Sequence, residues 1–344
     1  MTISVIIPVY NVEKYIRRCL ESVIDQESDG FNIECVIVDD CSPDDSMMIV
    51  NDIINNYHGS VISFKILRHE VNKGLSAARN TGIKASTGDY LFFIDSDDHI
   101  LENTLKNFNA YSDKYSYADV IMGNSLELEN HYLSNTSMTN NANSLYFIDD
   151  KCEIMYSVLM RRIDRHAWNK LVRRSLIVDN DLYFDDGLLY EDVTWTYRLF
   201  SCVSSVLIAP ELTYMYEYNT SSIVHTPAER SNQVVRSFVF ISDYLFHHQP
   251  IIDGKPKFFV EHQLFVHHWM IIAIDLYEKY GAGSHTRAKL NMLKRKLLWN
   301  SVSHLRPFMM LYFLTMFKPF TWFLKLHVFR NNIDRINRIV NKLS

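Results

Sequence analysis

Residues 3–9 read Ile3-Ser-Val-Ile-Ile-Pro-Val9, a nearly continuous apolar run that is rich in β-branched side chains. Such a run is typical of a strand that is buried on both faces of a sheet. Apolar residues in helical spacing follow it, in a helix that we expect Asn11 to cap and that runs to about Asp25. A second buried strand is predicted at Ile33–Val38. A strand, a helix and another strand in this order predict a parallel α/β sheet.

The same alternation continues to about residue 100. A second helix is expected to end near Tyr57, and further strands are predicted at Phe64–Leu67 and Tyr90–Ile94, with a helix at Leu75–Ala85 between them. One acidic cluster follows the second strand and another follows the fourth. Because parallel α/β sheets bind ligands at the carboxyl ends of their strands, both clusters are candidate ligand-binding groups.

Length and charge suggest two regions of different character. The chain has 344 residues, enough for about two domains, and its 47% hydrophobic residues exclude wholesale disorder. The net charge is −5, but residues 293–344 contain ten basic and one acidic side chain; this segment therefore carries +9 and residues 1–292 carry −14. A basic, aromatic segment is typical of proteins that bind an anionic membrane or a nucleic acid. A basic helix pair packed on the acidic body is the alternative.

The cysteines and the apolar segments indicate a reducing compartment. The five cysteines are odd in number and form no CxxC pair, so a disulfide framework or a zinc site is not expected. The N-terminus lacks the basic region of a signal peptide, and the longest apolar run, Phe308–Phe317, is about half of what a membrane-spanning helix needs. We therefore expect a cytoplasmic protein.

The two acidic clusters suggest specific chemistry. Asp95-Ser96-Asp97 places two carboxylates just past a buried strand, and hard oxygen ligands of this kind suit Mg²⁺ or Mn²⁺. Asp39-Asp40 could bind a ribose or the imino N–H of a pyrimidine. For each cluster the alternative is a solvated surface turn.

Two further segments are candidates for the site. Residues 72–82 combine small residues at a helix start with Lys73 and Arg79, which suits a phosphate; a tightly packed helix is the alternative. No Walker or GxGxxG motif is present, which argues against P-loop NTPases and dinucleotide dehydrogenases. Glu191-Asp192 opens a helix, where the acids either compensate the helix dipole or supply a general base.

These segments together resemble a known family. The segments that carry the resemblance are Ser4-Val-Ile-Ile-Pro-Val-Tyr-Asn11, Val38-Asp-Asp-Cys-Ser42, Asn72-Lys-Gly-Leu75 through Arg79-Asn-Thr-Gly82, Phe93-Ile-Asp-Ser-Asp-Asp98 and Glu191-Asp192. In this order they resemble the family 2 inverting glycosyltransferases of the GT-A fold. The nearest likeness is the bacterial branch that builds capsular, lipopolysaccharide and exopolysaccharide chains. Trp168-Asn-Lys-Leu171 and Arg174-Ser-Leu-Ile177 also resemble that branch.

The resemblance implies a fold and a domain organisation. It covers about residues 1–225, which are expected to form a GT-A-type, Rossmann-like α/β domain with a mostly parallel sheet flanked by helices. Residues 1–100 would be its nucleotide-binding half and residues 101–225 its acceptor half. Residues 226–344 have helical periodicity and would form a helical, membrane-associating C-terminal extension.

The resemblance also assigns roles to individual residues by matching position. Asp192 would be the catalytic base with Glu191 as its neighbour, and Asp97 with Asp95 would hold the metal ion. His225 lies close to where some relatives place a metal or phosphate ligand. The residues that would bind the nucleotide sugar are Pro8, Val9, Tyr10, Asp39, Asp40, Lys73, Arg79, Asp95 and Ser96.

The implied reaction moves a sugar from a nucleotide-diphosphate donor to a saccharide or lipid-linked acceptor with inversion. The enzyme would lie at the inner face of the cytoplasmic membrane, held on anionic lipid by residues 293–344, and would not bind nucleic acid because its body is acidic. One alternative is a sugar-phosphate nucleotidyltransferase, although residues 9–13 lack the Gly- and Lys/Arg-rich triphosphate loop that it needs. The other is a non-catalytic carbohydrate-binding protein with a decayed transferase fold.

Overall fold

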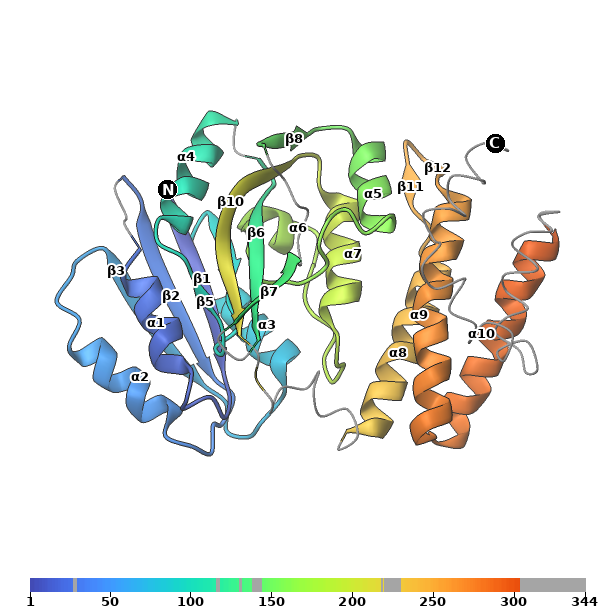
Figure 1. Ribbon diagram of the computed structural model, residues 1–344, viewed down its shortest axis with the longest axis horizontal. Coiled ribbons are helices and arrows are strands. Elements are labelled where there is room, and N and C mark those ends of the chain that lie inside the picture. The colour runs from blue at the N-terminus through green and yellow to red at the C-terminus, as the bar shows by residue number, and fades with distance from the viewer. Residues whose placement is uncertain are drawn as a thin grey trace. The chain divides into compact units, whose positions relative to one another are not determined.

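The computed structural model describes residues 1–303 apart from 27–29, 116–117, 130–131, 138–143, 218 and 220–229. The chain divides into two compact units. The first contains residues 1–227 and 249–261, and the second contains residues 228–248 together with the chain from 262 onward. Figure 1 shows the elements of both units along the chain. The expected division into functional domains at residue 225 stays a prediction.

The first half of the sheet is parallel, as the apolar runs predict. Its strands are β1 (Thr2–Val9), β2 (Asn32–Asp39), β3 (Ile62–Arg68) and β4 (Tyr90–Phe93). β1 pairs in parallel with β2 on one side and with β4 on the other. Because Val9 pairs with Asp39 and Ile6 pairs with Phe93, the three strands end at the same edge of the sheet. Both acidic clusters therefore leave the sheet at one edge.

The second half of the sheet is mixed. β9 (Lys170–Arg173) runs antiparallel between β4 and β6 (Val120–Glu129), and β10 (Val206–Glu217) runs parallel to β6. Shorter strands complete it: β5 (His99–Ile100), β7 (Tyr132–Ser137) and β8 (Tyr146–Ile148). The order is β3-β2-β1-β4-β9-β6-β10-β5. The expected fold class, a mostly parallel sheet flanked by helices, is confirmed.

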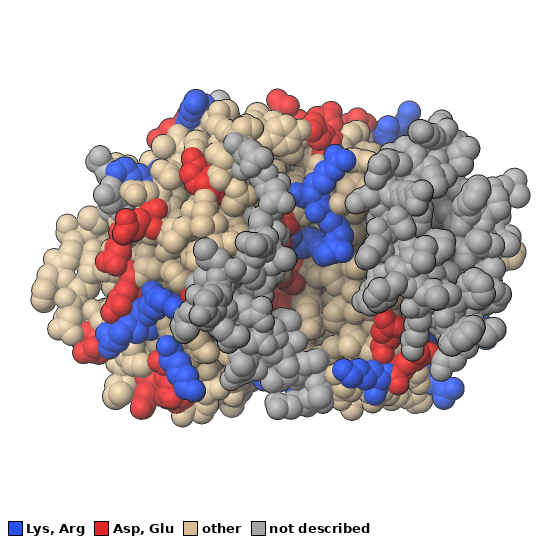
Figure 2. All heavy atoms as spheres, in the orientation of Figure 1, with Lys and Arg blue, Asp and Glu red and all other residues tan. Residues whose placement is uncertain are grey.

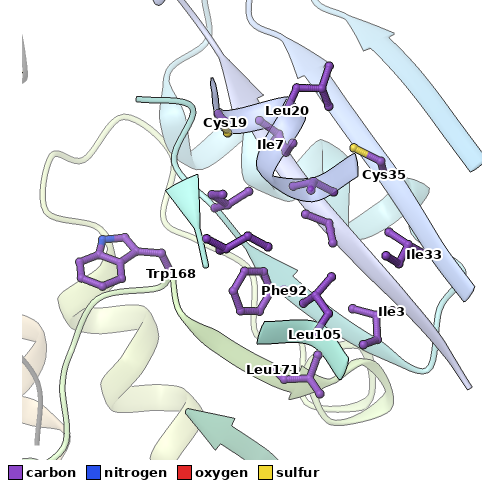
Figure 3. Close-up of a cluster of buried hydrophobic side chains, with 14 of the residues drawn as sticks. Ile3, Ile7, Cys19, Leu20, Ile33, Cys35, Phe92, Leu105, Trp168 and Leu171 are labelled. Atoms are coloured by element: carbon purple, nitrogen blue, oxygen red, sulfur yellow. The ribbon is translucent and has the colours of Figure 1, made fainter. Parts of the chain in front are cut away.

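Helices cover both faces of this sheet. Those of the first unit are α1 (Ile16–Ile24), α2 (Ser46–Asn55), α3 (Leu75–Ala85), α4 (Thr104–Lys114), α5 (Lys151–Leu159), α6 (Arg174–Asp179) and α7 (Asp192–Cys202). Alternate residues of β1 point to opposite faces. Ile3 and Ile7 pack with Cys19 and Leu20 of α1 in the cluster that Figure 3 shows.

The opposite face of the sheet is covered by α3 and α7. Phe93 packs edge-on against Phe184 and Trp195 at ring-centroid distances of 5.6 Å. α3 approaches β1 so closely that a Cβ atom on Gly82 would lie 2.4 Å from Cγ2 of Ile6. Only glycine permits this approach, and the approach places the preceding turn of α3, which carries Arg79, under the carboxyl edge of the sheet.

The start of the first helix differs from the prediction. Asn11 adopts the left-handed conformation with a φ of 55°, and α1 begins only at Ile16. The backbone N–H of Asn11 donates to Oγ of Ser42 at 2.8 Å, and that of Glu13 donates to Oδ2 of Asp44 at 2.8 Å. These bonds hold the segment against the turn after β2, so its N–H groups do not start a helix.

The second unit is helical. Its helices are α8 (Ser231–His247), most of α9 (Phe259–Tyr280) and α10 (Ser284–Ser303). Nζ of Lys289 lies 2.7 Å from Oδ2 of Asp243, and Phe238 packs against Trp269. A hairpin of β11 (Ile251–Ile252) and β12 (Lys255–Pro256) belongs to the first unit. Of the helices in the described part of the chain, none has both the length and the apolar character to cross a bilayer.

Candidate active site

A buried arginine joins two acidic segments that are far apart in the sequence. Arg79 is 2% exposed, and its Nη1 donates to Oε1 of Glu191 at 2.5 Å while its Nη2 donates to Oδ1 of Asp95 at 2.6 Å. Burial opposes its charge, but the carboxylates of Asp95 and Glu191 raise the pKa of Arg79 overall. α3 thus brings the start of α7 next to the turn after β4.

The turn after β4 is anchored to β10. The hydroxyl of Tyr214 accepts a hydrogen bond from the backbone N–H of Asp95 at 3.1 Å and donates to Oδ2 of Asp98 at 2.7 Å. Oδ1 of Asp98 accepts from the backbone N–H of Glu217 at 2.9 Å. Burial, followed by the charges of Asp97 and Asp95, raises the pKa of Asp98. Asp98 therefore holds the turn in place through both of its carboxylate oxygens.

Asp97 has the environment of a ligand-binding carboxylate. Its Oδ2 accepts a hydrogen bond from Nδ2 of Asn219 at 3.0 Å. Burial, reinforced by the charge of Asp95, raises the pKa of Asp97 to about 6. An opposite charge placed beside such a group would be favourable, since removal from water disfavours its ionised form.

The donor set of this turn fits a divalent cation only in part. Asp95 and Asp97 offer the hard carboxylate oxygens that Mg²⁺ and Mn²⁺ prefer. In the described part of the chain, no three or more His, Cys, Asp or Glu side chains are grouped so as to hold a metal ion. The two carboxylates thus fit a cation whose other ligands are phosphate oxygens and water, as is usual for Mg²⁺. His225 lies outside the described residues.

The two acids after β2 are engaged with the protein itself. Oδ1 of Asp40 accepts from the backbone N–H of Lys73 and Oδ2 accepts from that of Gly74, both at 2.8 Å. Oδ1 of Asp40 also lies 2.6 Å from Nδ1 of His69. Asp39 accepts from the backbone N–H of Ser42 at 2.7 Å. Both acids are buried, so they shape the loops that surround the candidate nucleotide site.

In the acidic pair at the start of α7, Glu191 is buried and Asp192 is partly exposed. Glu191 is 5% exposed, and burial raises its pKa to about 7 despite the charge of Arg79. Burial also raises the pKa of Asp192, against the opposing effects of His166 and Arg79. A carboxylate with a raised pKa is suited to accept a proton near neutral pH.

The remaining predicted residues surround this edge. Pro8 and Val9 are buried in β1, whereas Tyr10 is 40% exposed just beyond it. Ser96 is buried inside the acidic turn, and the side chain of Lys73 is exposed. Their binding roles stay predictions.

Sequence reasoning missed a charged group next to Asp192. Asp164, His166 and Lys170 form it, and none of the three was assigned a role. A signal was present in the sequence, because the three consecutive titratable residues 164–166 lie just before Trp168.

Comparison with known proteins identifies the family. Residues 4–177 match the sequence model of Glycosyl transferase family 2, which spans just over half of the chain. The chain belongs to this family, as the resemblance predicts.

Two relatives of the chain carry the names of glycosyltransferases. The poly(ribitol-phosphate) beta-N-acetylglucosaminyltransferase TarS of Staphylococcus aureus (strain Mu50) is 29% identical over 218 residues, which are 63% of this chain and 35% of that protein. The putative glycosyltransferase EpsH of Bacillus subtilis is 34% identical over 229 residues, 64% of this chain and 62% of that protein. The chain thus covers less than two thirds of either relative.

A solved structure shows the same fold. The crystal structure of S. aureus TarS residues 1–349 in complex with UDP-GlcNAc has a TM-score of 0.63 and 20% identity. The match covers 87% of this chain and 81% of that chain. At this identity the likeness concerns the fold, which is the GT-A type predicted from the sequence.

Proposed function

We propose that the protein transfers a sugar, with inversion, from a nucleotide-diphosphate sugar to a saccharide or lipid-linked saccharide of a bacterial surface polymer. The observation that carries the proposal is the double contact of Arg79. It places the start of α7, with its candidate base, next to the turn that carries the candidate metal ligands. Family membership and the names of TarS and EpsH support the same reaction class.

The donor half of the site would hold the nucleotide diphosphate at the acidic turn. Asp97 and Asp95 would ligate Mg²⁺ or Mn²⁺, which when bound stabilises negative charge on the departing diphosphate. Pro8, Val9 and Tyr10 would border the base at the end of β1. The loop that Asp40 fixes carries Lys73, whose exposed side chain would reach the phosphates.

The acceptor half would use Asp192 as general base. Its carboxylate accepts the proton of the acceptor hydroxyl while that oxygen attacks the anomeric carbon from the face opposite the diphosphate. A single displacement of this kind inverts the anomeric configuration. Glu191, which is held by Arg79, keeps the start of α7 in register with the donor turn.

The basic C-terminal segment would hold the enzyme on anionic lipid. In the described part of it, α10 carries Lys294, Arg295 and Lys296, and Trp299 is 69% exposed. On the face that Figure 2 shows, acidic and basic side chains of the described residues are interspersed. The proposal rests on the ten basic groups of residues 293–344, each of which would contribute about 1 kcal/mol near an anionic surface. Deleting them should abolish the salt-sensitive binding to anionic vesicles, and equal binding to neutral vesicles would contradict the proposal.

The test is a panel of nucleotide-diphosphate sugars, each incubated with the full chain and Mn²⁺, with release of the nucleoside diphosphate as the readout. Slow donor hydrolysis by the wild type and its loss in Asp192→Asn support a glycosyltransferase. Release of diphosphate from a nucleoside triphosphate and a sugar phosphate would instead indicate a nucleotidyltransferase. No turnover with any donor would favour a non-catalytic protein.

A further inference from the structure

The loop between α5 and β9 is bound to the face of α7 that carries Asp192. Oγ1 of Thr196 donates to the backbone carbonyl of Arg165 at 2.7 Å. Thr196 lies four residues after Asp192, and residues with this spacing share one face of a helix. The loop that contains Arg165 and His166 is therefore bound to the same face of α7 as the candidate base, one helical turn further along.

His166 is held in this loop by three contacts. Its Nδ1 lies 2.7 Å from Oδ1 of Asp164, whose side chain is 6% exposed. Its ring stacks on Trp168 with a centroid distance of 4.5 Å and an interplanar angle of 6°. Its backbone carbonyl accepts a hydrogen bond from Nζ of the fully buried Lys170 at 2.6 Å. The imidazole is thus fixed on both its face and its edge.

The same stack continues to the donor side of the site. Trp168 stacks on Tyr214 with a centroid distance of 4.4 Å and an interplanar angle of 12°. The hydroxyl of Tyr214 binds the turn of Asp95 and Asp98, as described above. His166 therefore belongs to a packed column that connects the acceptor side with the acidic turn.

Charged groups from several elements act on Asp192. They are His166, Asp164 and Arg165 of the loop, Lys170 of β9, Arg79 of α3, Asp95 of the turn after β4, and the neighbouring Glu191. Of the effects that favour its ionised form, that of His166 is the largest and that of Arg79 is second. The charge of Arg79 is already shared between Glu191 and Asp95.

His166 can supply this charge because of Asp164. Burial alone would lower the pKa of His166, but the charge of Asp164, and then that of Asp192, raises it overall. Asp164 is itself held ionised, since His166 and Lys170 lower its pKa against the effect of burial. Asp164 thus favours the positive form of this imidazole.

We propose that His166, fixed by Asp164 and Trp168, is a positioning residue whose positive charge keeps the Asp192 carboxylate ionised for the acceptor proton. The inference rests on the proposed role of Asp192 as general base. It extends that role by naming the residue that sets the lower pH limit of the reaction. By linkage, the coupling is mutual: the charge of Asp192 must also stabilise the protonated form of His166.

The coupling can be measured without any turnover. We would follow the His166 Cε1–H resonance by NMR from pH 5 to 9 in the wild type, in Asp192→Asn and in Asp164→Asn, with the exposed His285 as internal control. Removing either carboxylate should lower the pKa of His166 by about one unit, the lower end of the effect of a close opposite charge. His285 should not move. An unchanged pKa of His166 in Asp192→Asn would overturn the proposal even if no donor is found.

The consequence for the reaction is measured by the pH profile of donor hydrolysis or transfer. In His166→Gln the acid limb should move to higher pH by about one unit, and at high pH the rate should return to within a few-fold of the wild type. His285→Gln should keep the wild-type profile. A uniform loss of rate at all pH values, with an unshifted acid limb, would show that His166 only supports the fold and would overturn the proposal. Absence of turnover in the wild type would instead count against the proposed function.

Discussion

Two acidic turns, at the ends of β2 and β4, look alike in the sequence and differ in the structure. Each follows a buried parallel strand and each contains adjacent aspartates. After β2, Asp40 binds two backbone N–H groups and His69. Both of its carboxylate oxygens are therefore used in contacts with the segment that follows β3. After β4, Asp98 alone takes the structural role, while Asp95 contacts Arg79 and Asp97 contacts Asn219.

The difference teaches which carboxylates are available for chemistry. A carboxylate that accepts several backbone hydrogen bonds stabilises a loop, and its removal should cost stability. A partly exposed carboxylate that contacts mainly side chains from other elements can rearrange its contacts around a ligand, and its removal should cost activity. The acids at the start of α7 are of the same kind as those of the turn after β4, because Arg79 forms ion pairs with both segments.

The largest effect is expected at the start of α7. Asp192→Asn keeps the shape of the side chain and removes the base, so transfer to acceptor should fall by about 10²- to 10⁴-fold. The affinity for the nucleotide diphosphate should change little, because the candidate metal ligands lie elsewhere. Steady-state transfer assays and calorimetric titration with the nucleotide measure the two quantities. Glu191→Gln should be milder; near-native transfer by Asp192→Asn with loss in Glu191→Gln would mean that the two roles are exchanged.

The next effect separates the two turns directly. Asp97→Asn should lower turnover by about 10²- to 10³-fold, the usual range when one electrostatic contact to developing charge is lost. It should also remove the dependence of nucleotide-diphosphate binding on Mn²⁺, measured by calorimetry with and without the ion. Asp52→Asn, at a side chain that is 57% exposed on α2, is the matched control. Equal affinity with and without Mn²⁺ in the wild type would refute the metal assignment.

Most of the nucleotide half of the fold could be predicted from the sequence. The helix expected at Leu75–Ala85 is α3 with the same bounds, and the strand expected at Phe64–Leu67 is the centre of β3. β-branched runs and helical spacing are local signals, so they can be recognised without knowledge of the tertiary structure. β9 was not predicted, because only the two central residues of its Lys-Leu-Val-Arg sequence are apolar, and its pairing with β4 and β6 is set by distant parts of the chain.

The site was predicted only as a set of residues. The sequence indicates Asp95, Asp97 and Asp192 as chemical groups, but the contact of Arg79 with Glu191 spans 112 positions and appears only in the fold. The same holds for His166, whose importance comes from its neighbours Asp164 and Asp192 rather than from a motif. The hydrogen bonds of Asp40 could not be predicted from the sequence either. Its partners are the backbone N–H groups of Lys73 and Gly74, and almost every residue has such a group.

A stability effect should mark the turn after β2. Asp40→Asn keeps one acceptor oxygen and turns an amide NH₂ group toward a backbone N–H, so we expect a loss of about 2–3 kcal/mol in the free energy of unfolding. For a unit of this size the melting temperature should fall by about 5–10 °C. Asp52→Asn should change it by less than about 0.5 kcal/mol, because its ion pair with Arg17 is exposed. If Asp40→Asn melted like the wild type but lost nucleotide affinity, the contrast between the two turns would fail.

The smallest effect is expected at His69, which links the turn after β2 to α3. Its Nδ1 lies 2.6 Å from Oδ1 of Asp40 and its Nε2 lies 2.9 Å from Oγ1 of Thr81. The glutamine side chain in His69→Gln can keep one of these contacts, so the loss should be about 1 kcal/mol, seen as a drop of about 2–4 °C in the melting temperature. Because both residues act on one network, the double variant Asp40→Asn/His69→Gln should lose less stability than the sum of the single variants. Strict additivity would show that His69 stabilises α3 on its own, and that Asp40 alone holds the loop.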